Sequence, residues 1–102
     1  MKMITIAIKR PAEAWKIKEV EDTLETYQDI VGGYIEHFLN IGEDKGVALF
    51  CNEEGKLLQL EPNIHVPELH DEIVGTIFAV RVDEEGEFTS LTESDKELFK
   101  GI

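Results

Sequence analysis

The chain has 102 residues, which suits one domain with a buried core and leaves little room for a second. Its 22 acidic and 10 basic residues give a formal net charge of −12, which argues against direct electrostatic binding to nucleic acid. A hydrophobic fraction of 42% indicates a folded chain, and the single Cys51 excludes an internal disulfide and a multi-cysteine metal site.

The first two predicted elements are strands. Residues Met3–Lys9 alternate isoleucine with smaller residues, which predicts a half-buried strand that ends at Arg10-Pro11. Residues Trp15–Lys18 predict a short second strand with its lysines on the wet face. Lysines on a strand discourage further pairing, so we expect this strand at a sheet edge.

A short helix and a double-glycine corner follow. Asp22 is the predicted N-cap, with Glu25 in the reciprocal capping-box position. An apolar stripe recurs at helical spacing. It consists of Leu24, Tyr27 and Val31, with Ile30 beside it. Gly32 supplies the left-handed residue that commonly ends a helix.

The period changes from helical to alternating directly after Gly33. Tyr34, Glu36 and Phe38 are predicted to face one side of a strand. Ile35, His37 and Leu39 are predicted to face the other side. The segment around Gly32-Gly33 is therefore interpreted as a joint that lays a helix against a sheet.

The middle of the chain predicts a hairpin. Val47–Asn52 and Lys56–Leu60 are its expected strands, joined by a glycine-ended turn. Residues Ile64–Glu72 predict an irregular connection. Ile73–Val82 predicts one further strand, in which Gly75 marks a bulge or a close approach.

The end of the chain predicts a second helix. Ser90 with Glu93 is the expected capping box for a helix over Glu93–Lys100. Its expected inward residues are Leu98 and Phe99, its end is Gly101, and Leu91 helps to fix its start.

These elements predict an α+β fold for residues 1–102 as a single domain. We expect a mostly antiparallel, curved sheet of about six strands, with the main helix and a short C-terminal helix on one face. The expected core includes Leu24, Tyr27, Val31, Ile35, Phe50, Ile77 and Phe78.

The residue types needed for catalysis are present but scattered. The three histidines, His37, His65 and His70, share no metal-ligand spacing, and His37 is expected to be half-buried. His70-Asp71 and Glu36 are the only residues that favour an enzyme. Asp83–Glu85 lacks the alternating spacing of a calcium loop, and Cys51 is expected to be buried and inert. We therefore expect no catalysis, no cofactor and no metal.

The N-terminal residues lack the long apolar block of a signal peptide, and no run approaches the roughly 20 apolar residues of a membrane helix. We expect a cytoplasmic protein that binds no membrane.

Several segments together resemble a known family. They are Leu24–Glu36 (LETYQDIVGGYIE), Asn52–Lys56 (NEEGK), Pro62-Asn63, Ile73–Thr76 (IVGT) and Glu87–Thr92. In order and spacing they resemble a family of small domains of unknown function from bacteriophages, conjugative elements and Firmicute genomes. The resemblance implies that the chain is one of the accessory proteins of mobile elements, and some of these proteins counter host defence. It implies no activity.

The leading hypothesis is a non-enzymatic protein that binds a host protein with a basic surface, as a DNA mimic would. The alternative is a sponge for a nucleotide messenger, with Tyr34 or Trp15 stacking on a base. A small structural or homodimerisation domain is a further alternative. Candidate binding residues are Gly32, Gly33, Tyr34, Glu36, Asn52, Glu53, Glu54 and Asn63.

Overall fold

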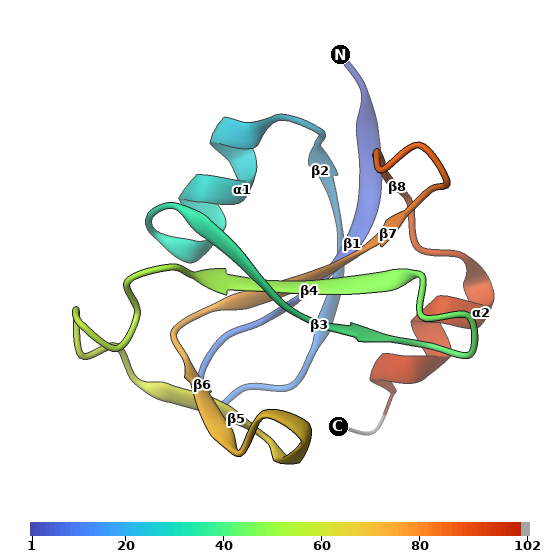
Figure 1. The fold of residues 1–102 in the computed structure, drawn as a ribbon. Coiled ribbons are helices and arrows are strands. Elements are labelled where there is room, and N and C mark those ends of the chain that lie inside the picture. The colour runs from blue at the N-terminus through green and yellow to red at the C-terminus, as the bar shows by residue number, and fades with distance from the viewer. Residues whose placement is uncertain (101–102) are drawn as a thin grey trace.

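The main sheet of the computed structural model, which describes residues 1–100, contains six antiparallel strands (Figure 1). Their bounds are β1 Met3–Lys9, β2 Lys16–Glu21, β3 Ile35–Ile41, β4 Val47–Asn52, β7 Ile77–Val82 and β8 Phe88–Thr89. The strand order is β2-β1-β7-β4-β3, and β8 pairs with β7. With its helices, the protein has the α+β fold that the sequence predicts.

A second, two-stranded sheet lies below the main sheet in Figure 1. It consists of β5 (Pro62–Val66) and β6 (Asp71–Val74), joined by the 3-10 helix η1 (Pro67–Leu69). The prediction of an irregular connection over Ile64–Glu72 is therefore wrong. The prediction of one strand over Ile73–Val82 is wrong as well, because Gly75, at φ 79°, separates β6 from β7.

The predicted hairpin partner of β4 is also absent from the described chain. Lys56–Leu60 forms successive turns instead of a strand. β4 pairs with β3 on one side and with β7 on the other, so both of its edges are already occupied. The segment Glu53–Glu61 is left as a loop between the two sheets.

The main helix, α1, spans Leu24–Val31 and is capped by Thr23, whose side chain accepts from the Thr26 amide. The prediction of Asp22 as the cap is wrong, because its carboxylate accepts a hydrogen bond from the Tyr27 hydroxyl at 2.6 Å. Leu24 is 60% exposed, so its assignment to the core is wrong too.

One face of the main sheet packs against α1 through an aromatic stack. Phe78 of β7 stacks on Tyr27 and on Phe50, with ring centroids 5.1 Å apart in each pair. The Phe88 ring lies 5.0 Å from Tyr27. The buried residues of this cluster are Ile4, Ile6, Tyr27, Val31, Phe78 and Val80, and Ile35 packs against them.

The opposite face is covered by the C-terminal segment and by the small sheet. Ala79, which alternates with Phe78 and Val80 along β7, packs with Leu91 and Phe99. Phe99 belongs to η2 (Glu97–Phe99), which follows α2 (Glu93–Lys96). The two helices therefore lie on opposite faces, and the prediction that they share one face is wrong.

The start of α2 also differs from the prediction. Thr92 is the N-cap and Asp95 completes the capping box, whereas the Ser90 hydroxyl accepts from the Thr5 amide at 2.9 Å. Phe99 is buried as expected, but Leu98 is 37% exposed. The predicted helix end at Gly101 lies outside the described residues.

The two edges of the main sheet are β2 and β3. β2 exposes Lys16 and Lys18, as predicted for an edge strand. In β3 the register shifts between His37 and Leu39, so the predicted strict alternation fails and His37 is exposed, not half-buried.

Every helix within residues 1–100 is too short or too polar to cross a membrane.

Candidate functional site

The double-glycine corner ends α1 as the sequence predicts. Gly32 has φ 81° and ψ 23°, a left-handed conformation that a residue without a Cβ adopts easily. The amides of Gly32 and Gly33 both donate to the Gln28 carbonyl, at 2.8 and 3.0 Å. Tyr34 is 67% exposed and precedes β3. The corner therefore leaves α1 and leads directly into an edge strand.

Asn52, at the end of β4, holds this corner in place. Its side chain is 5% exposed. Nδ2 donates to the Val31 carbonyl at 3.1 Å, and Oδ1 accepts from the Glu54 amide at 2.7 Å. A Cβ on Gly33 would lie 2.9 Å from Asn52 Nδ2, so the close approach requires glycine. The polar atoms of Asn52 thus serve the fold and organise the loop that follows.

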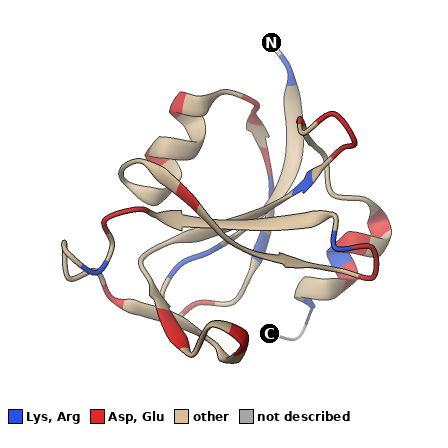
Figure 2. Ribbon diagram, viewed as in Figure 1, with Lys and Arg blue, Asp and Glu red and all other residues tan. Residues whose placement is uncertain are grey.

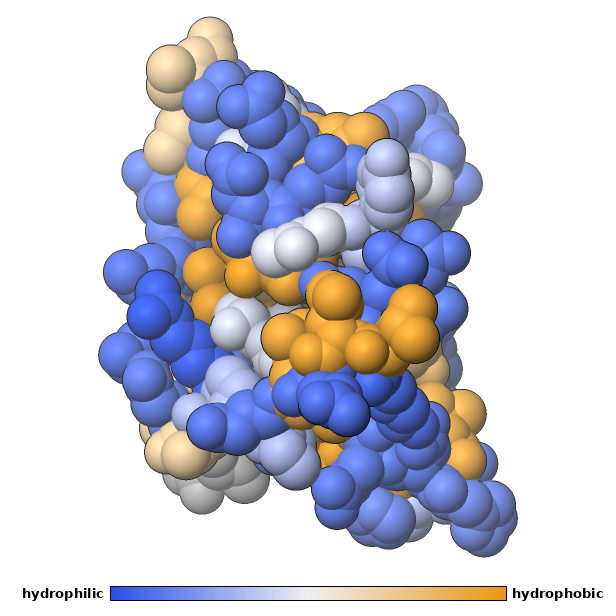
Figure 3. Space-filling model, turned by 90° about the vertical axis from the view of Figure 1, so that its left-hand side faces the viewer, coloured by the Kyte–Doolittle hydropathy of each residue, from blue (hydrophilic) through white to orange (hydrophobic). Residues whose placement is uncertain are grey.

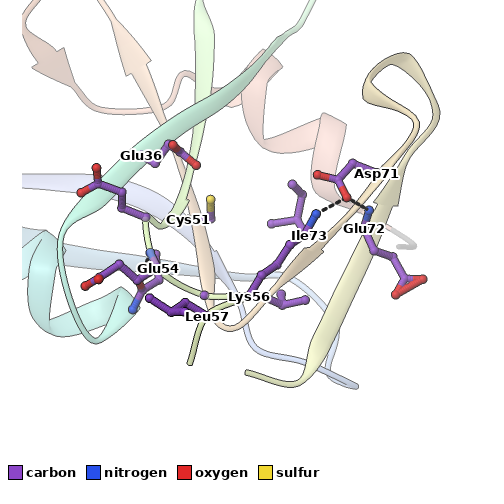
Figure 4. Close-up of a pocket in the computed structure, with 12 residues that line it drawn as sticks. Glu36, Cys51, Glu54, Lys56, Leu57, Asp71, Glu72 and Ile73 are labelled. Carbon is purple, nitrogen blue, oxygen red and sulfur yellow. Dashed lines mark hydrogen bonds and ion pairs between the residues drawn. The ribbon is translucent and has the colours of Figure 1, made fainter. Parts of the chain in front are cut away.

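That loop forms one wall of a groove of about 250 Å³. β6 of the small sheet lies on the other side, and β3 and β4 contribute to it from the main sheet. In Figure 4, Glu36 and Asp71 lie on opposite sides, with the sulfur of Cys51 between them. The charged lining residues are Glu36, Glu53, Glu54, Lys56, Asp71 and Glu72.

The groove is strongly anionic, with five carboxylates and one lysine. Lys56 Nζ pairs with Asp71 Oδ1, and this bond holds the pKa of Asp71 below its usual range. Within residues 1–100, the other four carboxylates make no ion pair. Acidic residues also line the surrounding loop and small sheet (Figure 2). The groove therefore favours a cationic ligand.

Cys51 lies in the apolar part of the groove. Its side chain is buried, as predicted, and burial raises the pKa of its thiol to about 11, with smaller contributions from Glu36 and Asp71. A thiol with this pKa is protonated at neutral pH, and the thiolate is the nucleophilic form. The arrangement gives Cys51 a packing role.

The loop packs closely against the small sheet. A Cβ on Gly55 would lie 2.8 Å from Val74 Cγ2, and one on Gly75 would lie 2.7 Å from Leu60 Cδ1. Between these close approaches, Leu57 and Leu58 project from the loop, 78% and 55% exposed. The sequence pattern does not predict that both leucines lie at the surface, because it indicates a strand over this segment.

The remaining predicted binding residues lie elsewhere. Gly32, Gly33 and Tyr34 line a shallow hollow with Gln28 and Asp29, none of which is cationic.

Asn63 connects the two sheets. Its Nδ2 donates to the carbonyls of Lys9 and Gly75, at 2.9 and 2.8 Å. The predicted set of binding residues thus divides into the groove, the hollow and this connection.

The residues that favoured an enzyme are only partly brought together. Glu36 and Asp71 share the groove, but His70, at φ 51°, ends η1 and is not part of the lining. No three His, Cys, Asp or Glu side chains of residues 1–100 are arranged to hold a metal ion. A nucleotide would also need a cation for its phosphates, and Arg81 is already bound to Asp95 and Asp44.

Comparison with known proteins places the chain in a family. No curated protein and no solved structure matches it. One family model, described as a domain of unknown function, matches residues 1–101, almost the full length. The chain therefore belongs to the family of domains of unknown function DUF3846.

Proposed function

We propose that this protein is a non-enzymatic binding protein that captures a basic surface of another protein. The observation that supports the proposal is the groove between the Glu53–Glu61 loop and β6, where four carboxylates have no ion-pair partner within residues 1–100. Complementary charge accelerates association and excludes partners of the same sign. A net charge of −12 adds a long-range attraction for cationic proteins.

The partner class that best fits this charge is a nucleic-acid-binding protein. The carboxylates would occupy positions that phosphates take on such a partner, as in a DNA mimic. The resemblance to domains of bacteriophages and conjugative elements suggests the setting, in which the captured protein belongs to the host and takes part in its defence.

Two features of the groove favour binding over catalysis. Its only thiol, Cys51, is protonated at neutral pH, and none of the three histidines, His37, His65 and His70, is among the lining residues. Nucleophilic catalysis needs a nucleophile and a base within hydrogen-bonding reach. The described lining residues offer no such pair.

The test compares two variants that each lose three negative charges. The first carries Glu36→Gln, Glu53→Gln and Glu54→Gln in the groove. The matched control carries Glu84→Gln, Glu85→Gln and Glu87→Gln in the exposed turn between β7 and β8, outside the groove. Immobilised proteins are exposed to a bacterial extract, and the captured proteins are identified by mass spectrometry with and without duplex DNA as competitor.

We expect the wild type and the control to capture basic, DNA-binding proteins, and the groove variant to lose them. Capture should be displaced by DNA and should weaken between about 0.05 and 0.5 M salt, because salt screens exposed charges. Capture that does not change with salt or with the groove variant would refute the proposal. Heat released on titration with cyclic or linear nucleotides would favour the nucleotide sponge instead.

A further inference from the structure

Two leucines project beside the acidic groove. Leu57 lines the groove and Leu58 follows it, both on the loop that Gly55 and Gly75 hold close to its neighbours. Figure 3 shows apolar residues gathered on the face that carries this loop, with hydrophilic residues around them. An exposed apolar patch surrounded by polar residues is typical of an interaction site.

The groove itself combines an apolar lining with an acidic rim. Its apolar lining residues are Cys51, Leu57, Ile73 and Val74. Its volume of about 250 Å³ lies below the roughly 300–1,000 Å³ of pockets that enclose small-molecule ligands. A space of this size and chemistry suits one long side chain with an apolar stem and a cationic end.

We infer that the groove and the Leu57-Leu58 pair together dock a linear segment of a partner protein, which inserts an arginine into the groove and packs an apolar side chain on the leucines. The inference rests on the proposed function and specifies its partner. Charge complementarity supports this occupant, because Glu36, Glu53 and Glu54 line the groove and have no ion-pair partner within residues 1–100.

Arginine fits better than lysine for two reasons. Its aliphatic stem can lie along Ile73 and Val74 while its head reaches the rim. Its planar guanidinium binds carboxylates through paired hydrogen bonds and is more weakly hydrated than an ammonium group. Lys56 already provides an ammonium group at Asp71, so the remaining carboxylates are open to a guanidinium from outside.

The test uses the full chain and short fluorescein-labelled peptides, with binding measured by fluorescence anisotropy. The main probe is GSLLRSG. Its partners replace the arginine with neutral citrulline, the arginine with lysine, or both leucines with serine. An oligo-arginine peptide of similar length measures attraction by charge alone.

Two protein variants test the two halves of the surface. Leu57→Ser with Leu58→Ser removes the apolar pair, and its control is Leu24→Ser, a leucine 60% exposed on α1 outside the groove. The Glu36→Gln, Glu53→Gln, Glu54→Gln variant removes the acidic rim, with the Glu84, Glu85, Glu87 variant as its control. Thermal melting establishes that each variant is folded, and the peptide series on the wild type needs no variant.

We expect GSLLRSG to bind the wild type about tenfold more tightly than the citrulline or serine peptide, which corresponds to about 1.4 kcal/mol. Both test variants should weaken this binding by a similar factor, and both controls should preserve it. The lysine peptide should bind more weakly than the arginine peptide.

Two negative results are distinguishable. If oligo-arginine binds but GSLLRSG binds no better than its serine counterpart, or the leucine variant binds it as tightly as the wild type, the docking inference is wrong and the proposed capture by charge stands. If no cationic peptide binds at low salt, both fail.

Discussion

The side-chain amide of Asn52 donates to the main-chain carbonyl of Val31, and this bond ties the end of β4 to the last turn of α1. The same side chain accepts from the Glu54 amide, where the groove-forming loop begins. One buried residue therefore sets the position of the helix corner and of the acidic loop together. The geometry of the candidate site depends on this link.

Replacing Asn52 with Ala should lower the free energy of unfolding by about 1–3 kcal/mol, because the Val31 carbonyl and the Glu54 amide lose a buried partner. Urea denaturation measures the loss. Asn40→Ala is the control, since Asn40 also donates to a carbonyl but is exposed. A loss at Asn52 no greater than that at Asn40 would contradict the structural role given to it.

Replacing Gly32 with Val should destabilise the protein through strain in the backbone. The residue lies at φ 81°, and apart from its chain neighbours and the backbone of α1 no atom lies within 4 Å of the position of a Cβ, so the Cβ itself adds no clash with the rest of the fold. Left-handed conformation penalises residues with a Cβ by about 1–2 kcal/mol, and asparagine tolerates it best. The melting temperature of Gly32→Asn should therefore be higher than the melting temperatures of Gly32→Ala and Gly32→Val. Equal melting temperatures for all three would show that the corner is not left-handed.

Ionisation of the Cys51 thiol should lower the stability of the protein at alkaline pH. Burial raises the pKa of its thiol to about 11, whereas the unfolded thiol ionises near pH 9. The unfolded state therefore releases its proton first. Stability from this group is complete below about pH 8.5 and is lost as the pH rises towards 11.

Urea denaturation between pH 8 and 11 measures this effect. Cys51→Ala should give a shallower decline, although not a flat one, because burial and the bond to Asp22 also raise the pKa of Tyr27. Native Cys51 should also react with iodoacetamide far more slowly than the unfolded chain. Rapid alkylation of the native protein would argue against its burial.

Protonation of the Asp95 carboxylate should lower the stability of the protein at acidic pH. It is 5% exposed and accepts from Arg81 Nε at 2.6 Å, and this bond lowers its pKa. A lowered pKa in the folded state means that the stability is present above the unfolded value, near pH 4, and is lost as the pH falls below it.

Asp95→Asn should lower the free energy of unfolding at neutral pH by about 1–3 kcal/mol and should reduce its dependence on pH in acid. Asp44→Asn is the matched control, because Asp44 pairs with the same Arg81 but its side chain is 63% exposed. The decrease in the free energy of unfolding of Asp44→Asn, measured in the same urea titrations, should be smaller than that of Asp95→Asn. A larger loss at Asp44 would reverse the assignment.

Local signals were enough to predict some elements. The isoleucines of Met3–Lys9 alternate because one side of β1 is buried under α1, and Gly32 ends α1 for a reason that concerns only its own backbone. Both caps were predicted one or two residues too early. Asp22 binds Tyr27, and Ser90 binds the Thr5 amide. Such contacts between distant residues decide between neighbouring cap-forming residues, and no local pattern reveals them.

The candidate site was only partly predictable for a similar reason. Glu36, Glu53 and Glu54 were expected to bind a partner, but Asp71 and Glu72 join them only because the chain folds back as β5 and β6. The apolar character of Leu57-Leu58 indicated a strand. Both edges of β4 are occupied by β3 and β7, which a hydrophobic pattern does not encode.

The small sheet leaves the chain's main path near Pro62 and returns to it at Gly75, and Asn63 fastens that return to β1. One wall of the groove is therefore an insert whose two ends meet. Lengthening, shortening or recharging β5 and β6 would leave every strand of the main sheet beside its present neighbours. A change confined to this short segment would therefore alter the charge and shape of the groove while the main sheet stays intact.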